Sequence, residues 1–353
     1  MATERFRLAE GHEISRIVKG GWQLSGDHGP VDREAAIQAM GEFVDAGVTT
    51  FDCADIYTGA EEMIGAFLAR RRDGAVRVHT KFVPDLDRLR SMDKAYVERV
   101  IDRSLLRLGV ARLDLVQFHW WDYAAPGYVE TALWLRELRQ AGKIKHLAVT
   151  NFDVPHLGEI VDAEIEVVAL QTQYSLLDHR PADAMAELAD RSGFHFICYG
   201  VLAGGFLTDA WLGRPDPGFA FENRSLVKYR LIIEEFGGWG LFQDLLAACR
   251  AIADRHAPAH PAVDISTVAI RHTLDQPRVA AAIVGARYAG RLGSTLAAFD
   301  INLDAEDRGR IDGVLSRARG PLGDCYALER DKGGRHGRIM KYNLNKEGHV
   351  SDA

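Results

Sequence analysis

The chain has 353 residues, a length that one large barrel-type domain can fill without a second domain. Hydrophobic residues make up 47% of it and charged residues 26%, and these ordinary proportions exclude a disordered or fibrous chain. The formal net charge of -7 disfavours nucleic acid as a partner, because binding a phosphate backbone requires clustered cations. We therefore expect a folded protein that acts on a small molecule.

The cysteines and the N-terminal segment indicate the cellular compartment in which the protein is expected to work. Cys53, Cys198, Cys249 and Cys325 form no C-x-x-C pair, so neither a zinc knuckle nor a disulfide scaffold is predicted. The first residues, MATERFRLAEGHEISR, lack the apolar core of a signal peptide, and no stretch approaches about 18 apolar residues. These features predict a protein of the reducing cytoplasm with no membrane span. No heptad repeat is present, so a homo-oligomer is neither predicted nor excluded.

Short apolar runs alternate with segments of helical period along the chain. The expected strands lie at residues 15–20, up to 51, and at 77–82, 113–119, 144–150, 167–171, 194–200 and 279–285. The expected helices begin after residue 32 and lie at 93–108, around 128–141, and at 180–192 and 264–276. Eight strands with intervening helices predict an α/β fold, a closed parallel (β/α)8 TIM barrel, with an open doubly wound sheet as the alternative.

Two segments exceed what such a barrel needs. Residues 205–260, after the seventh strand, contain GRPDPGFAFENRSLVKYR and an additional helix, and residues 317–353 form a glycine-rich C-terminal extension. We expect both to cover the catalytic end of the barrel, although a partly ordered surface chain is an equal alternative for the extension. The chain as a whole, 1–353, is expected to form a single domain with its core at about 14–316.

Polar residues recur where the expected strands end, and in a parallel barrel these carboxyl ends share one face. Asp52 and Tyr57 follow the second strand, Lys81 the third and His119 the fourth. Strands five to eight are followed by Thr150, Asn151, Gln171, Tyr199, Gly285 and Arg287. Each residue alone is explained as a helix cap, a solvated charge or a core side chain. Their joint placement on one rim instead predicts an active site.

Four of these residues make chemical sense as an acid–base unit. A free tyrosine, with a pKa of about 10, is a weak proton donor at neutral pH. We expect Lys81 to stabilise the Tyr57 phenolate and Asp52 to hold that lysine charged and in place. His119 can then donate a hydrogen bond to the substrate oxygen. A metal-dependent hydrolase is disfavoured and no metal site is predicted, because none of the 13 histidines forms a His-x-His pair.

Several motifs carry a resemblance to a known family. FDCADIYTGAEEMIG resembles the aldo-keto reductase signature F-D-x-A-x-x-Y-G-x-x-E, with Thr58 standing before the expected Gly59. HTKF resembles the family's lysine strand, RSLLRLGVARLDLVQFHW its histidine strand, GKIKHLAVTNF its fifth strand and IVGAR its eighth. The matches run in family order from about residue 14 to 316 and imply an NAD(P)H-dependent enzyme built on a (β/α)8 barrel.

The resemblance also assigns roles to single residues. It implies that Tyr57 donates the proton, that Lys81 and Asp52 tune it, and that His119 orients the carbonyl. Cofactor contacts are implied for Gly21, Trp22, Asp52, Thr150, Asn151, Gln171, Tyr199, Gly200, Val201, Leu202, Gly204, Arg224, Gly285, Arg287 and Arg291, with Arg224 on a loop that folds over the cofactor. Substrate contacts are expected for Trp22, Tyr57, His119 and Trp120, and these tryptophans with Trp121 suggest an apolar, aromatic pocket, core packing being the alternative.

Cations after the eighth strand favour NADPH over NADH. Arg287 and Arg291 can supply charge to the 2′-phosphate of the adenosine. Where many family members carry Glu-Asn, however, this chain has Ser294 and Thr295. This departure affects the adenine contacts and keeps NADH as an alternative cofactor.

The predicted reaction is the reduction of an aldehyde or ketone. The same groups run in reverse would make the protein an alcohol or sugar dehydrogenase. A cofactor-sensing regulatory barrel, like the potassium-channel subunits of the family, is a third alternative. Intact Tyr57, Lys81 and His119 favour catalysis, and the sequence does not specify which carbonyl compound is the substrate.

Overall fold

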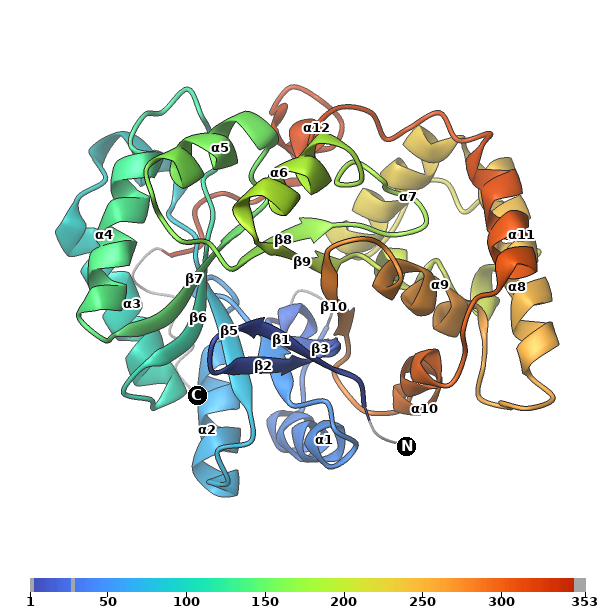
Figure 1. The fold of residues 1–353 in the computed structure, drawn as a ribbon, viewed down its shortest axis with the longest axis horizontal. Helices are drawn as coiled ribbons and strands as arrows, with labels where there is room; N and C mark the ends of the chain where they lie inside the picture. The colour runs from blue at the N-terminus through green and yellow to red at the C-terminus, as the bar shows by residue number, and fades with distance from the viewer. Residues whose placement is uncertain (1–2, 27–28, 346–353) are drawn as a thin grey trace.

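Eight parallel strands close into a barrel ringed by helices (Figure 1) in the computed structural model, which describes residues 3–26 and 29–345. The strand order is β10-β3-β4-β5-β6-β7-β8-β9. Closure is complete because β10 pairs in parallel with both β3 and β9. The predicted (β/α)8 barrel is confirmed, and the open sheet is excluded.

The strands fall close to their predicted positions. The expected first strand divides into two, because Ser15 ends β2 and Ile17 begins β3, and the expected strand at 167–171 is shifted to Ala169–Gln173. The barrel strands are β3 (Ile17–Gly20), β4 (Thr50–Asp52), β5 (Arg77–Phe82), β6 (Leu113–Phe118), β7 (Ile144–Thr150), β8 (Ala169–Gln173), β9 (His195–Tyr199) and β10 (Val279–Gly285).

Local capping explains where several helices begin. Asp32, Asp93, Asp153 and Asp264 each accept a hydrogen bond from the backbone N–H three residues further on, which satisfies a donor that the helix leaves free. The helices are α1 (Arg33–Asp45), α2 (Ala60–Arg71), α3 (Lys94–Leu108), α4 (Tyr128–Gln140), α5 (Val154–Asp162), α6 (Ala184–Ser192), α7 (Arg224–Phe236), α8 (Trp239–His256), α9 (Ile265–Leu274), α10 (Leu292–Leu296), α11 (Ala305–Leu315) and α12 (Ala327–Arg330).

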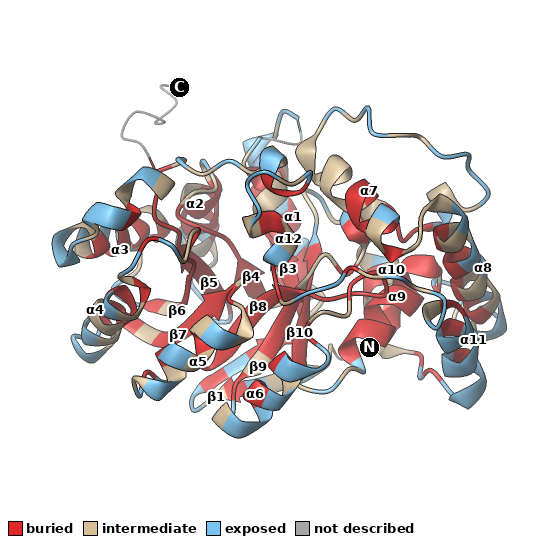
Figure 2. Ribbon diagram, turned by 90° about the horizontal axis from the view of Figure 1, so that it is seen from above, coloured by how far each residue is buried: buried red, intermediate tan, exposed pale blue. Residues whose placement is uncertain are grey.

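Side chains of the strands alternate between the barrel interior and the surrounding helices. On β6 and the two residues after it, Gln117 and His119 point inward, whereas Phe118 and Trp120 point outward and pack together with ring centroids 5.9 Å apart. Figure 2 shows the buried strands at the centre and the exposed residues on the outer faces of the helices. This alternation decides which side chains reach the catalytic face.

A second hydrophobic core lies beside the barrel, where α7, α8, α9 and α11 pack together (Figure 1). The sequence predicted one additional helix between residues 205 and 260, but the structure has two, α7 and α8. Gly237 and Gly238 separate them with φ values of 152° and 86°, which residues with side chains rarely adopt. Phe206, Phe236 and Phe242 are fully buried within this core.

The C-terminal extension lies over the carboxyl ends of the strands, as expected from the sequence. Asp324 accepts a hydrogen bond from the backbone N–H of Val154 at the start of α5, at 2.8 Å. Further along, the side-chain amide of Asn345 donates to the carbonyl of Val83, which follows β5, at 2.5 Å. The extension therefore spans the catalytic face from α5 to the end of β5.

A two-stranded antiparallel hairpin, β1 (Arg5–Ala9) and β2 (His12–Ser15), covers the opposite end of the barrel and was not predicted. It brings His12 Nε2 to 2.9 Å from His79 Nε2, and the His146 ring lies 5.0 Å from that of His12. Burial, together with neighbouring cationic or histidine side chains, lowers the pKa of His12 to about 2, of His79 to about 3 and of His146 to about 4. All three rings are therefore neutral at pH 7.

This cluster predicts a loss of stability in mild acid. Below a pH of about 6.5 the unfolded chain takes up protons that the folded chain does not, so the free energy of unfolding falls by about 1.4 kcal/mol per pH unit for each such histidine. Among the residues that the structure describes, neither ring nitrogen of His146 has a hydrogen-bond partner. We expect His146→Leu to reduce the pH slope by about one proton without lowering stability at pH 7, as measured by urea unfolding between about pH 7 and pH 5.

His260→Gln is the matched control, because His260 lies outside the cluster and should leave the slope unchanged. An unaltered slope in His146→Leu would show that His146 is protonated in the folded protein.

Within the described ranges, no helix has the length and apolarity needed to cross a membrane. In the same residues, no group of histidine, cysteine or acidic side chains has an arrangement that could hold a metal ion.

Candidate active site

A buried ion pair between Lys81 and Asp52 lies at the carboxyl ends of β5 and β4. The Lys81 ammonium is 2.8 and 2.7 Å from the two carboxylate oxygens and 2.9 Å from the carbonyl oxygen of Cys53. The side-chain amides of Gln117 and Gln171 donate to Asp52 Oδ1 at 2.8 and 2.6 Å. Three strands and the end of a fourth therefore fix one carboxylate, and the lysine is held with its charge balanced.

Tyr57 lies beside this pair, in the turn after β4. Lys81 Nζ is 5.2 Å from the centre of the phenol ring, and the Trp22 ring meets the same ring edge-on at 4.9 Å. Burial, reinforced by the charge of Asp52, holds the pKa of Tyr57 well above its usual value. This direction is opposite to the one the sequence suggested, because the hydrogen bonds of Lys81 go to Asp52 and Cys53. Tyr57 is consequently a protonated phenol at neutral pH.

His119 follows β6 and points into the barrel. Its Nδ1 lies 3.0 Å from the carbonyl oxygen of Thr150, and its buried Nε2 has no hydrogen-bond partner in the described chain. Burial, and then the charge of Arg330, lowers the pKa of His119 to about 3, so the ring is neutral at pH 7. A carbonyl oxygen can only accept, so Nδ1 carries the proton and Nε2 presents a lone pair. In this state His119 accepts a hydrogen bond, whereas the sequence suggested that it donates one.

The aromatic wall next to His119 differs from the predicted one. Trp121 meets the His119 ring edge-on at 4.3 Å, and Tyr326 of the extension does so at 5.6 Å. Trp120, one of the two tryptophans expected to contact substrate, instead points outward, and its indole N–H donates to the carbonyl of Ala125 at 2.9 Å. The alternation along the chain places residues 119 and 121 on one side and residue 120 on the other.

The residues expected at the nicotinamide end of the cofactor lie together. The Tyr199 hydroxyl donates to Asn151 Oδ1 at 2.8 Å, and Asn151 has a φ of 62° that turns its side chain toward β9. The Gln171 amide that donates to Asp52 also donates to Gln117 Oε1 at 2.7 Å. Tyr199, Asn151 and Gln171 therefore form one wall of the site, next to the Lys81–Asp52 pair.

The glycines after β9 are covered by a side chain of α7. A Cβ atom added to Gly200 would lie 2.9 Å from the hydroxyl oxygen of Tyr229, and one added to Gly204 would lie 2.7 Å from its ring. Between these glycines, Val201 is buried and Leu202 is half-buried. Tyr229, a residue that the sequence did not single out, therefore packs against these glycines. The expected approach of the cofactor's pyrophosphate to the same backbone stays a prediction.

The first barrel loop is joined to α7. Gly21 precedes a single turn of 3-10 helix that begins with Trp22, and the Trp22 indole donates to Ser225 Oγ at 3.1 Å. Arg224, expected on a loop, is the first residue of α7, because Asn223 caps the helix one residue earlier. Its guanidinium donates to a carbonyl of the C-terminal extension, 3.2 Å away.

The residues after β10 are arranged around an exposed edge. Gly285 faces the Gln23 side chain so closely that no Cβ atom fits there. Arg287 is half-buried and donates to the carbonyl of Pro30 at 3.3 Å, while Arg291 is exposed and precedes α10. The two predicted phosphate-binding cations therefore lie on the same loop, between β10 and α10.

Arg330 of the extension is a site residue that the sequence did not reveal. Its guanidinium donates to the carbonyls of Trp120 at 2.5 Å, Trp121 at 3.0 Å and Asn151 at 2.7 Å, and to the Tyr123 hydroxyl at 2.7 Å. It also stacks 3.9 Å from the centre of the Tyr123 ring. One arginine thus joins the loop that follows His119 to the loop that carries Asn151.

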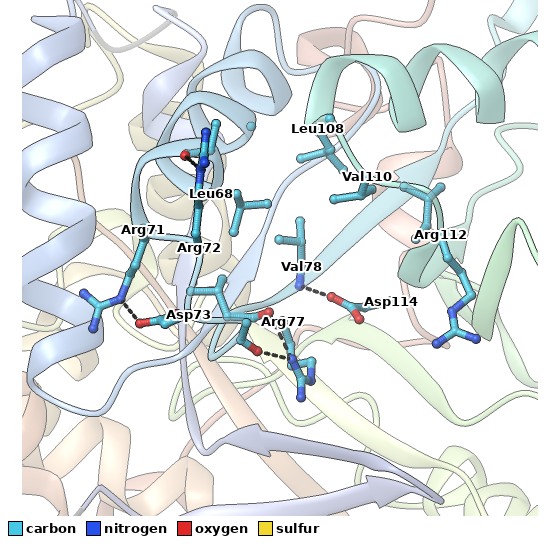
Figure 3. Close-up of a pocket in the computed structure, with 16 residues that line it drawn as sticks. Leu68, Arg71, Arg72, Asp73, Arg77, Val78, Leu108, Val110, Arg112 and Asp114 are labelled. Carbon is cyan, nitrogen blue, oxygen red and sulfur yellow. Dashed lines mark hydrogen bonds and ion pairs between the residues drawn. The ribbon is translucent and has the colours of Figure 1, made fainter.

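A surface pocket of about 490 Å³ lies at the other end of the barrel (Figure 3). Its walls are the last residues of α2 and α3 and the first residues of β5 and β6, including Arg72, Arg77 and Arg112. Figure 3 also shows the backbone N–H of Val78 directed at Asp114, a hydrogen bond of 3.0 Å. We place the chemistry at the carboxyl ends instead, because the buried acid–base residues lie there.

Comparisons with known proteins identify the family to which the chain is similar. The family model described as Aldo/keto reductase family matches residues 16–316. Aldo-keto reductase YhdN of Bacillus subtilis is 28% identical over 313 residues, which cover 86% of this chain and 91% of that protein. The NADH-specific methylglyoxal reductase of Escherichia coli is 24% identical, covering 83% and 92%. A solved glycerol dehydrogenase from Gluconobacter oxydans shares the fold, with a TM-score of 0.75, 24% identity and coverage of 92% and 98%.

Proposed function

The chain belongs to the aldo/keto reductase family and is an NAD(P)H-dependent oxidoreductase, and from this premise we propose that it reduces an aldehyde or ketone with NADPH and a proton from Tyr57. The observation that carries the proposal is the buried Lys81–Asp52 pair beside the Tyr57 ring. Capping or solubility would not require a buried lysine and carboxylate next to a phenol at the catalytic face.

The residues present fit a dinucleotide. Tyr199, held by Asn151, offers a ring face for the nicotinamide, and Asn151 and Gln171 offer amides for its carboxamide group. Arg287 and Arg291 would bind the 2′-phosphate. Bound NADPH would supply a hydride to the carbonyl carbon. The glycines after β9 would let a pyrophosphate come close to the backbone, and Tyr229 of α7 packs against Gly200 and Gly204 beside them.

Tyr57 supplies the proton for the substrate oxygen. Its raised pKa keeps the phenol protonated, so the donor is present throughout the neutral range. As the carbonyl carbon accepts the hydride, negative charge develops on the carbonyl oxygen, and the phenol proton of Tyr57 transfers to that oxygen. The nearby Lys81 ammonium stabilises the phenolate that remains, and Asp52 keeps that ammonium in place. Solvent then reprotonates Tyr57.

His119 favours a second function, the oxidation of an alcohol. A neutral ring with its proton on Nδ1 accepts a hydrogen bond at Nε2, and an alcohol hydroxyl can donate it. A carbonyl substrate has no proton to offer, so His119 would contribute to its binding mainly through shape. Comparing the two directions at matched cofactor concentrations would identify the favoured one.

The first test is titration of the protein with NADPH and NADH by fluorescence quenching, followed by nicotinamide absorbance with a panel of aldehydes and ketones. Tight binding with carbonyl-dependent oxidation of NADPH supports the proposal. Binding without turnover on any carbonyl or alcohol would instead indicate a cofactor-sensing regulatory barrel. Failure to bind either nucleotide would contradict the proposal. The Escherichia coli relative is named as NADH-specific. A preference of this chain for NADH would show that Arg287 and Arg291 do not select the 2′-phosphate of NADPH.

The pKa shifts predict a pH profile. Reduction requires protonated Tyr57, whose pKa lies well above 10, and His119 stays neutral above about pH 3. We expect kcat for reduction to be flat between about pH 6 and pH 9, and kcat for alcohol oxidation to rise over that range because oxidation requires the phenolate. Both are measured at constant ionic strength. An alkaline decline of reduction centred near pH 8 would show that Lys81 lowers the pKa of Tyr57 after all.

A further inference from the structure

Four charged side chains are buried together next to the wall that carries Tyr199. Arg180 binds Asp178 through two nitrogens, at 2.9 and 2.6 Å, and reaches Glu329 at 3.2 Å. Lys228 lies 3.4 Å from the other oxygen of Glu329. The side chains of Asp178, Arg180 and Glu329 are at most 2% exposed and that of Lys228 is 14% exposed. Two cations balance two anions, and Glu329 links Arg180 to Lys228.

This cluster is difficult to explain as a device for stability. Removing charges from water costs more than a buried ion pair usually returns, and apolar side chains of similar volume are often as stabilising. Burial opposes the ionisation of Glu329, but the charges of Lys228 and Arg180 outweigh it and lower its pKa to about 2. Glu329 is therefore an ionised acceptor in the interior, and the chain maintains the charge where an apolar residue would serve the core.

The ammonium of Lys228 connects the cluster to the site. It lies over the ring of Tyr199 at 5.0 Å, and also 5.8 Å from the ring of Tyr229 and 5.6 Å from that of Tyr326. A cation over an aromatic face is attracted to it, so one ammonium holds three tyrosine rings. Tyr199 is the ring on which the nicotinamide is proposed to stack, and Tyr229 covers the glycines after β9.

Glu329 comes from a different part of the chain than the residues it holds. It lies on α12 in the C-terminal extension, beyond the residues 16–316 that match the family model, whereas Lys228 lies on α7. Tyr229 follows Lys228 directly on α7, so the ion pair between Lys228 and Glu329 also anchors the turn of helix whose tyrosine packs on the glycines after β9. The extension thereby holds the helix that flanks both the Tyr199 ring and the glycines after β9.

We propose that Glu329 is a positioning residue for the cofactor, which fixes Lys228 over the Tyr199 ring and so sets how long the dinucleotide stays bound. The proposal rests on the proposed use of NAD(P)H. Glu329 touches no reacting atom, so it acts on cofactor release and leaves the hydride step itself unaffected.

The test compares wild type, Glu329→Gln, Glu329→Asp and the double variant Lys228→Met/Glu329→Gln, with Glu306→Gln as the control in an exposed ion pair on α11. The double variant removes one charge of each sign, so the remaining Asp178–Arg180 pair stays balanced and the fold is preserved. NADPH dissociation is measured by stopped-flow displacement with excess NADP+, and hydride transfer by single turnover at saturating NADPH.

We expect both Gln-containing variants to release NADPH about tenfold faster, with single-turnover hydride transfer within about twofold of wild type. Glu329→Asp should recover part of the slow release, and Glu306→Gln should match wild type. A wild-type rate of NADPH dissociation in the folded double variant would overturn the proposal. So would a change in the rate of hydride transfer as large as the change in the rate of NADPH release. If wild type binds no nucleotide, the proposed function fails and this proposal fails with it.

Discussion

Tyr57→Phe should lose turnover by a factor of about 100 to 10,000 while it still binds the nicotinamide cofactor. The substitution removes only the hydroxyl, and the ring that meets Trp22 edge-on at 4.9 Å is preserved. The Lys81 ammonium lies 5.2 Å from the centre of the Tyr57 ring. In the described part of the chain, no other phenol takes the place of Tyr57 beside this ammonium. Steady-state kcat and a fluorescence titration with NADPH separate the two effects.

Tyr128→Phe is a suitable control, because the Tyr128 hydroxyl bonds to the exposed Glu159 on α5 and not to an acid–base residue of the site. Its kcat should equal that of wild type. If Tyr57→Phe reduces carbonyls at the wild-type rate, the proton comes from elsewhere and the assignment of Tyr57 as the donor is wrong. If the variant also loses cofactor binding, Tyr57 serves mainly to shape the site and the proton assignment lacks support.

The barrel and the acid–base residues could be predicted because each signal is local. An apolar run that ends in Asp52, Lys81 or His119 places that residue at the end of a strand, and parallel strands bring these ends to one face. The same reasoning could have found Gln117, which lies two residues before His119, and it supports the expected place of Trp121, two residues after His119 and on the same side of the chain. Alternation was available from the sequence and would also have excluded Trp120.

The remaining features depend on contacts between distant parts of the chain. Lys81 was expected to lower the pKa of Tyr57, but the outcome depends on where its ammonium points and on how deeply the phenol is buried. The tautomer of His119 depends on a carbonyl of another strand. Glu329 and Arg330 lie in ALERDKGG, which has no helical period or motif to mark them. Only folding shows that this stretch covers the site.

The second large effect is expected from breaking the buried ion pair between Lys81 and Asp52. Lys81→Met should destabilise the protein by about 3–5 kcal/mol, because it leaves the Asp52 carboxylate buried without its cation. Both side chains are almost fully buried, at 5% and 6% exposure, so water cannot replace the lysine. Urea unfolding at pH 7 measures the loss. A stability equal to that of wild type would mean that the carboxylate takes up a proton or reaches water in the variant.

The double variant Lys81→Met/Asp52→Asn separates stability from chemistry. It removes both charges, and the asparagine oxygen can still accept from the amides of Gln117 and Gln171, so most of the lost stability should return. Turnover should stay as low as in Lys81→Met, because the Tyr57 phenolate then forms without a cation beside it. If stability and turnover both returned, the ammonium would be needed only to neutralise Asp52. If stability alone returned, Lys81 would serve the proton transfer directly, as its position beside the Tyr57 ring implies.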